Sequence, residues 1–108
     1  MKLPNCEQAI IPDMKLHGYL LNEENSKGKS AFFYKMGFEK EQFGLLKNPL
    51  AQLACTGELI GTIPGNFGEK YKVVGQLNNP AGRNALVLSI WMFDPGSDIP
   101  RFITAYPF

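Results

Sequence analysis

Apolar residues in the first half of the chain recur at helical spacing. A first helix is predicted to begin at Asp13, a residue type that caps helix N-termini, and Gly18 is expected to weaken it. The apolar positions that follow step by two, four and one, so they can share one stripe of a helix. This stripe consists of Met14, Leu16, Leu20 and Leu21.

Two more helices are predicted before residue 58. Residues 29–36 form the second, and Gly37 closes it, since glycine readily adopts the left-handed conformation that ends many helices. Residues 39–56 form the third and longest, whose apolar positions lie on a single face. Pro49 lies on the other side and is expected to kink this helix or split it in two, because proline lacks a backbone donor. The apolar face consists of Phe43, Leu46, Leu50, Leu53 and Ala54.

From Glu58 onward the pattern changes to short β-branched and alternating runs separated by turn residues. The run at 83–93 is apolar on both faces, as expected for a central strand covered on two sides. Short connecting loops favour antiparallel pairing of neighbours. The predicted fold is one α+β domain over residues 1–108, with N-terminal helices packed on a C-terminal four-stranded antiparallel β-meander. The strands are predicted at 58–63, 68–77, 83–93 and 101–106.

Composition narrows the functional classes only a little. Apolar residues make up 44% of the 108 residues and charged residues 19%, which is typical of a folded domain with one modest core. The net charge of +1 gives no overall signal for nucleic acid or membrane, so any basic patch must be local. The glycine-rich stretches lack the spacing of a phosphate-binding loop, and no cofactor is expected.

Cys6 and Cys55 are the only cysteines, and they lie about fifty residues apart with no neighbouring metal-ligating pair. A zinc site is not expected, and both residues are interpreted as reduced thiols. The alternative is a single disulfide between them, which no secretory signal favours. The apolar run near the N-terminus contains only Ile10 and Ile11, so neither a signal peptide nor a membrane anchor is expected. A cytoplasmic protein is therefore predicted.

Symmetric loops in the two hairpins would fix which residues of the sheet share a face, since directly opposed residues do so. On this map Arg101 and Thr104 lie on opposite faces, and only a bulge or twist near Pro100 brings them together. The pairs that the map implies are Leu77 with Arg83, Tyr71 with Ser89, Trp91 with Arg101, and Leu88 with Thr104.

One face of this map carries a set of residue types that suits ribonuclease chemistry without a metal, namely Lys70, Lys72, Thr104 and Tyr106. Such chemistry needs a group that activates the 2′-hydroxyl, a cation for the charge that develops on phosphate, and a ring that stacks on a base. The alternative interpretation is a solvated strand edge, in which the lysines, the threonine and the tyrosine are ordinary strand residues.

The two strand arginines each allow two interpretations. Arg101 opposite Trp91 suggests either a structural cation–π pair or a phosphate contact, for which the planar guanidinium fork is well suited. Arg83 either anchors its turn by bonding carbonyl groups or directs a cation at a ligand. His17 is the only histidine, which excludes a mechanism based on two histidines.

Several segments of the chain resemble a bacterial domain family of about this length to which no activity is assigned. They are "LPNCEQAIIPDMKLHGYLLN", "GKSAFFYKMGF" and "GEKYKVVGQLNNPAGRNALVLSIWMFDPGSDIPRFITAYP", which together cover nearly the whole chain. The most specific parts are a Gly-Arg pair before a strand that ends in Trp, and the closing Pro-Arg-x-x-Thr-Ala-Tyr-Pro.

A weaker resemblance concerns function. Helices followed by a four-stranded meander, with a threonine on the last strand and cations on the strands before it, are similar to the barnase–EndoU–colicin–RelE group of ribonuclease toxins. The resemblance implies a catalytic residue on a helix, at His17, Lys15 or Lys29. It further implies catalytic roles for Lys70, Arg83, Arg101 and Thr104, and substrate binding by Tyr106, with Trp91 as a second aromatic candidate.

The sequence therefore predicts one of two functions. The first is a metal-independent endoribonuclease of toxin type that cleaves RNA through a 2′,3′-cyclic phosphate. The second is a non-catalytic module that binds a protein partner, such as an immunity-like protein, through the C-terminal edge strand, which would also suit a homodimer. The first function predicts that the site residues converge on one patch that is open to solvent.

Overall fold

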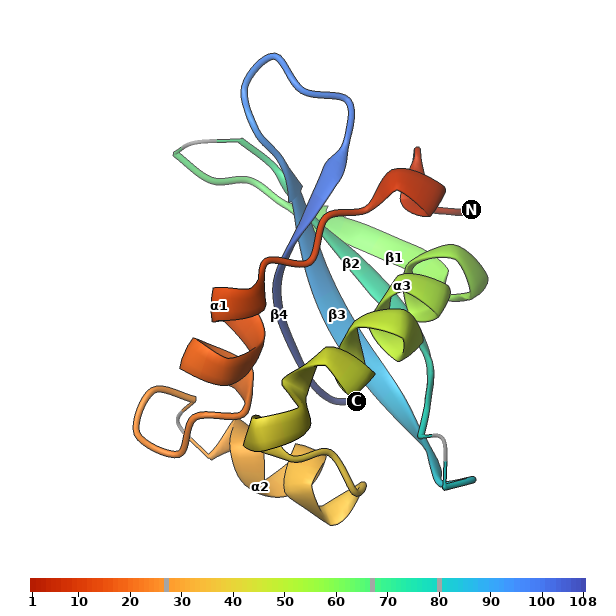
Figure 1. Cartoon of the computed structure of the whole chain (residues 1–108). Helices are drawn as coiled ribbons and strands as arrows, with labels where there is room; N and C mark the ends of the chain where they lie inside the picture. The colour runs from red at the N-terminus through yellow and green to blue at the C-terminus, as the bar shows by residue number, and fades with distance from the viewer. Residues whose placement is uncertain (27, 67, 80) are drawn as a thin grey trace.

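N-terminal helices precede a four-stranded antiparallel sheet with strand order β1-β2-β3-β4, which confirms the predicted α+β fold class (Figure 1). The computed structural model describes residues 1–26, 28–66, 68–79 and 81–108. The helical elements are η1 (Cys6–Gln8), α1 (Asp13–Lys15), η2 (Leu16–Leu20), α2 (Lys29–Lys35), η3 (Lys40–Leu46) and α3 (Lys47–Thr56). The strands are β1 (Glu58–Ile63), β2 (Lys70–Asn78), β3 (Asn84–Phe93) and β4 (Pro100–Pro107).

The first predicted helix is less regular than its apolar stripe suggested. α1 passes directly into the π-helical turn η2, in which the N–H of Leu21 donates to the carbonyl of Leu16 at 2.8 Å. Leu16, Leu20 and Leu21 are fully buried, but Met14 is 68% exposed and does not belong to the stripe. Pro12, and not the predicted aspartate, occupies the N-cap position.

The predicted third helix is split in two, as the proline within it suggested, but the break lies elsewhere. Gln42 has non-helical φ −122° and ψ 40° inside η3, whereas Pro49 is the third residue of α3. At that position the missing N–H has no cost, because the first N–H groups of a helix have no partner within it. Pro49 is also buried, so its predicted place opposite the apolar face is wrong. The face itself is confirmed by the full burial of Leu46, Leu50, Leu53 and Ala54.

The β2–β3 hairpin keeps the predicted faces although its register differs. Leu77 pairs with Ala85, and Tyr71 pairs with Trp91, each two residues from the partner that a symmetric loop predicted. Since side chains alternate across a strand with a period of two, an even shift leaves every residue on its predicted face.

A β-bulge in β4 changes the second hairpin. Ile90 pairs with Thr104, yet the next residue, Trp91, pairs with Phe102, so Ile103 is an extra residue in β4. Phe102 thereby moves to the opposite sheet face from the one predicted for it. It joins Trp91 on the buried face, where the two rings meet edge to face at a centroid distance of 5.3 Å.

The same bulge moves Arg101. It pairs with Met92, so the predicted Trp91–Arg101 pair is wrong. Arg101 now lies on the sheet face that also carries Thr104. The bulge that the sequence required for this convergence is therefore present.

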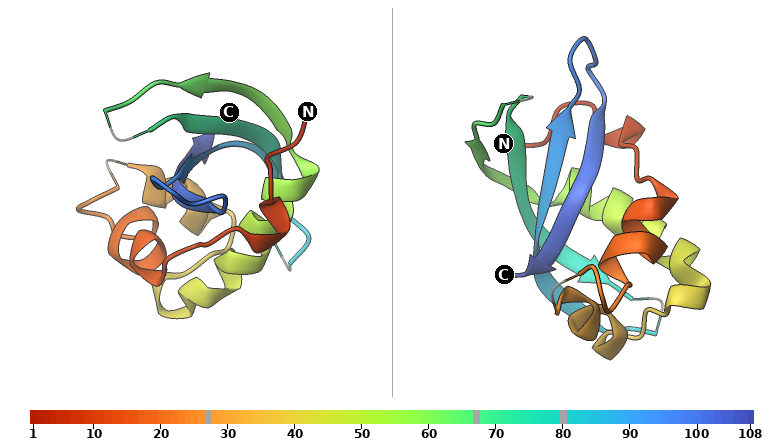
Figure 2. Two further views of the ribbon diagram at one scale, coloured as in Figure 1. Left: turned by 90° about the horizontal axis from the view of Figure 1, so that it is seen from above. Right: turned by 90° about the vertical axis from the view of Figure 1, so that its left-hand side faces the viewer.

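The helices cover one face of the sheet, and the sheet curls so that β1 and β2 arch over β4 (Figure 2). The covered face supplies the sheet side of the core, with Val73, Trp91 and Phe102 fully buried. The indole N–H of Trp91 donates to the Ser89 hydroxyl at 2.8 Å, which satisfies its buried donor. Leu88, Ile90 and Met92, on the other face of β3, are also buried, which confirms that this strand is covered on two sides.

Cys6 and Cys55 form a disulfide that ties η1 to α3, so the expectation of two reduced thiols is wrong. No local pattern indicates this contact, because the two residues are 49 positions apart. Disulfides persist in oxidising compartments. In the described parts of the chain no helix combines the length and apolar character needed to cross a membrane.

Candidate functional site

Polar side chains gather on the sheet face opposite the helices, which we call the open face. Its floor is formed by three alternating residues of β3, Leu88, Ile90 and Met92, all at most 9% exposed. The polar residues around this floor are partly buried, so their groups are held in place yet remain reachable from solvent. They are Lys70 and Lys72 on β2, Arg101, Thr104 and Tyr106 on β4, and Lys15, Tyr19 and Lys29 from the helices beside β4.

Tyr19, Lys29 and Thr104 form a hydrogen-bonded triangle at the centre of this face. The Lys29 ammonium donates to the Tyr19 phenol oxygen at 2.5 Å and to the Thr104 hydroxyl at 3.2 Å. The Thr104 hydroxyl lies 3.5 Å from the Tyr19 oxygen, to which it donates. The ammonium is also 5.6 Å from the ring centroid of Tyr106 and 5.0 Å from that of Tyr19.

The triangle changes the acidity of Tyr19. Partial burial by itself raises the pKa of this phenol, but the hydrogen bonds from Lys29 and Thr104, with the charges of Lys29 and Lys15, outweigh it and hold the pKa below its ordinary value. A phenol oxygen that already accepts two hydrogen bonds is well prepared to carry a negative charge. Tyr19 is thus the residue of the open face best suited to accept a proton.

A depression of about 420 Å³ adjoins the triangle along β4. Lys15, Lys70 and Arg101 line it, and Met92 lies between the two strand cations in the sheet. Arg101 is held by a bidentate pair with Asp94, in which its Nε and Nη2 groups donate at 3.0 and 2.9 Å.

Arg101 and Asp94 affect each other's protonation, and Lys15 is affected by its neighbours. The hydrogen bond with Asp94 raises the pKa of Arg101, and the same bond lowers the pKa of Asp94. Burial lowers the pKa of Lys15, and the charges of Arg101 and Lys70 lower it further against the opposing influence of Tyr19. The positive charges around this depression therefore repel one another.

Three of the residues singled out in the sequence lie away from the open face. Arg83 is at the other end of β3, where its Nη1 group donates to the Lys35 carbonyl at 2.7 Å and anchors the β2–β3 turn to α2. Trp91 is fully buried in the core. The His17 ring packs against Phe43 at a centroid distance of 4.7 Å. The structure does not bring any of the three together with Thr104.

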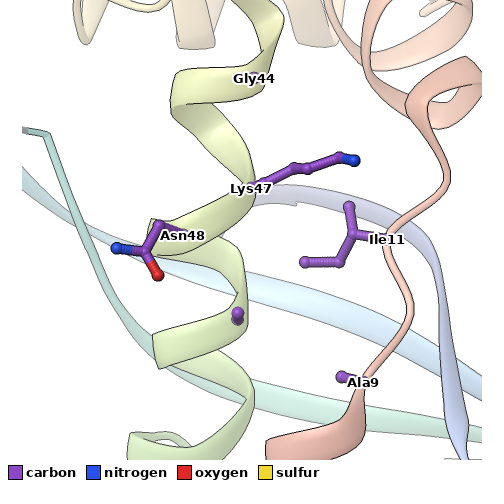
Figure 3. Close-up of a pocket in the computed structure, with 6 residues that line it drawn as sticks. Ala9, Ile11, Gly44, Lys47 and Asn48 are labelled. Atoms are coloured by element: carbon purple, nitrogen blue, oxygen red, sulfur yellow. The ribbon is translucent and has the colours of Figure 1, made fainter.

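A second depression, of about 360 Å³, lies between the segment before α1 and α3 (Figure 3). Its lining includes Ala9, Ile11 and Asn48, and its lysine, Lys47, forms an ion pair with Asp13. Because that cation is already neutralised and the other walls are largely small or apolar, the arrangement offers little to a charged ligand.

Sequence reasoning missed Tyr19, whose phenol oxygen accepts two hydrogen bonds on the open face. A lone tyrosine in an irregular helix carries no motif, and its partners are 10 and 85 residues away. Lys15 and Lys29 were two of three open alternatives for the helix residue. The observed geometry favours both over His17.

The chain matches one protein-family model, and its fold is similar to that of a solved structure. The family model described as "Domain of unknown function (DUF6883)" matches residues 2–108. Among solved structures, the chain is similar to one in a contact-dependent growth inhibition toxin–immunity protein complex from Klebsiella pneumoniae 342, with a TM-score of 0.69 and 14% sequence identity. That match covers 92% of this chain and 99% of the other. No sequence among the curated proteins matches.

Proposed function

The chain belongs to the DUF6883 family, and from that premise we propose that it is a metal-independent endoribonuclease of toxin type. The observation that carries the proposal is the triangle of Tyr19, Lys29 and Thr104 on a cation-rich open face. The fold shared with a chain of a toxin–immunity protein complex is consistent with a toxin-type role.

The proposed reaction is cleavage of RNA by attack of a ribose 2′-oxygen on the adjacent phosphate. Tyr19, as phenolate, takes the proton of the 2′-hydroxyl. The new bond to phosphorus expels the 5′-oxygen and leaves a 2′,3′-cyclic phosphate. Lys15, whose pKa is lowered by burial and by neighbouring cations, gives a proton to the departing oxygen.

The remaining residues bind the substrate. Lys29 and Thr104 would contact the non-bridging phosphate oxygens, where the fixed ammonium stabilises the charge that develops in the transition state. Tyr106 lies beside Lys29 at the rim and offers a ring on which a base can stack. Arg83 and Trp91 have no part in this proposal.

The test is cleavage of a fluorescent RNA oligonucleotide in buffer with EDTA, with analysis of the product ends. The wild type is expected to yield 2′,3′-cyclic phosphate. Tyr19→Phe and Lys29→Met are each expected to lower kcat by about 10²- to 10³-fold. Lys40→Met, which removes an exposed lysine outside the open face, is the matched control. The proposal would be refuted if the wild type did not cleave the RNA, or if both variants cleaved it at the wild-type rate.

A second candidate function is binding of a protein partner, which the structural neighbour supports because it comes from a toxin–immunity protein complex. The C-terminal edge strand is a less open edge than the sequence suggested. Ile10 pairs with β4, accepting from the N–H of Phe102 at 2.8 Å and donating to the Pro100 carbonyl at 2.9 Å. A binding module would leave RNA intact in the same assay.

A further inference from the structure

The depression beside the triangle has the geometry of an anion site. Lys70 pairs with Met92, and Met92 pairs with Arg101, so the two cations lie on neighbouring sides of one apolar residue. Lys15 faces them from α1. The three charged groups thus come from three separate elements and enclose one depression.

Arg101 is paired with Asp94, but Lys15 and Lys70 have no carboxylate partner in the described lining of this depression. The described residues that line it include no carboxylate. Asp94 accepts two of the five N–H groups of Arg101, which fixes the plane of the guanidinium and leaves the other donors for a ligand. The lowered pKa of Lys15 reflects, after burial, its proximity to Arg101 and Lys70. A bound anion would relieve this repulsion.

The distance between the depression and the triangle also suits two neighbouring phosphates of one strand. Met92 and Ile90, the sheet partners of Arg101 and Thr104, are two residues apart on β3, which corresponds to about 7 Å along the strand. Lys15 connects the two places, because its ammonium is 5.6 Å from the Tyr19 ring centroid. One nucleotide of an extended strand spans a comparable length.

We infer that Lys70 and Arg101 bind a second RNA phosphate, next to the one that is cleaved, and that Lys15 lies between the two phosphates. The substrate class is then a strand with at least two consecutive phosphates, and a dinucleoside monophosphate is a poor substrate. The identity of the ligand rests on the proposed function, whereas the anion site itself does not. The guanidinium fork and the lysines are the groups that bind phosphate well.

The first test is independent of activity. Inorganic phosphate is titrated into the full-length protein and followed by the backbone amide NMR signals of β2 and β4. Saturable shifts centred on Lys70 and Arg101 are expected, and Lys70→Met should weaken binding at least fivefold. Lys47→Met, which alters the depression in Figure 3, is the control and should bind phosphate like the wild type.

The second test compares a dinucleoside monophosphate with the same molecule carrying one extra phosphate at its 5′ or its 3′ end. One of the two extended substrates should have a kcat/KM at least tenfold higher, and Lys70→Met should reduce this ratio towards one. The control variant Lys40→Met should keep the ratio of the wild type.

The outcomes separate the two proposals. If the protein binds phosphate saturably but does not cleave RNA, the anion site is supported and the proposed ribonuclease function is refuted. RNA cleavage at equal kcat/KM for all three substrates would overturn the second phosphate site and leave the function standing. If the depression does not bind phosphate but binds a glutamate-rich peptide, these cations serve an acidic protein partner. That outcome would also overturn the inference.

Discussion

At the scale of single residues, the two tyrosines on the helical side have opposite surroundings. Tyr19 accepts hydrogen bonds from an ammonium and a hydroxyl, which favour its anionic form. Tyr34 donates its O–H to the carbonyl of Leu21, which favours the neutral form, and burial followed by the charges of Glu23 and Glu41 raises its pKa. The pKa of a tyrosine phenol is thus lowered at Tyr19 and raised at Tyr34 within the same domain.

The tyrosine absorbance of the folded protein should therefore titrate in separated steps. Tyr19 loses its proton below the ordinary phenol pKa of about 10, and Tyr34 loses its proton above it. Tyr19→Phe is expected to remove the earliest step in a spectrophotometric pH titration, and Tyr34→Phe the latest. If Tyr19→Phe removed the last step instead, the triangle would not exist in solution.

If Tyr19 is the catalytic base, the same pKa sets the pH dependence of cleavage. The cleavage rate should rise with pH as the phenolate of Tyr19 forms, below the range of an ordinary phenol, and fall again at higher pH as the proposed acid Lys15 loses its proton. Lys29→Met removes the donor that lowers this pKa, so any residual activity should rise only at higher pH. A profile without a rising limb below the range of an ordinary phenol would contradict the assignment of Tyr19 as the base.

At the scale of elements, two close contacts fix how α3 lies on the sheet. A Cβ at Gly75 of β2 would lie 2.9 Å from the Cα of Gly57 and 3.3 Å from the Cγ of Leu53. A Cβ at Gly57 would meet backbone carbonyls of Leu53 and Val74 at 2.8 Å. Both glycines are required because backbone approaches backbone where the helical half passes into the sheet.

Gly75→Ala is accordingly expected to lower the free energy of unfolding by about 1–3 kcal/mol, the usual cost of overpacking. The matched control is Gly44→Ala in η3, where a Cβ would have no atom within 4 Å. Urea denaturation followed by tryptophan fluorescence measures both. Equal stability of the two variants would mean that α3 packs less closely than the structure shows.

At the scale of the whole molecule, the disulfide closes the N-terminal segment onto the helical layer. A loop of about 50 residues corresponds to about 4 kcal/mol of stabilisation by the chain-entropy relation. The same segment places Ile10 against β4, so the disulfide helps to hold the edge of the sheet beside the open face.

Reduction of the Cys6–Cys55 bond is therefore expected to lower the free energy of unfolding by several kcal/mol, up to about 4. Urea denaturation with and without a thiol reductant measures the difference, and mass spectrometry verifies the redox state. The double variant Cys6→Ser with Cys55→Ser should be insensitive to the reductant. An oxidised protein with the stability of this double variant would contradict the expectation.

The sequence by itself determined the four strands, the order of helices before strands and the fold class. Helical spacing, turn residues and strand alternation act over a few residues, so they can be read locally, and they located all four strands within one or two residues. The sequence also predicted which residues of β2 and β3 share a sheet face. This prediction is correct although the register was wrong by two residues, because side chains alternate between faces with a period of two.

The tertiary structure alone decided which of the candidate residues meet. The bulge at Ile103 depends on packing, because it places Phe102 against Trp91 in the core and thereby turns Arg101 to the open face. Thr104 meets Lys29 and Tyr19 across 75 and 85 residues, and the cysteines pair across 49. No local pattern specifies such contacts, since they arise only when distant elements are packed around a common core.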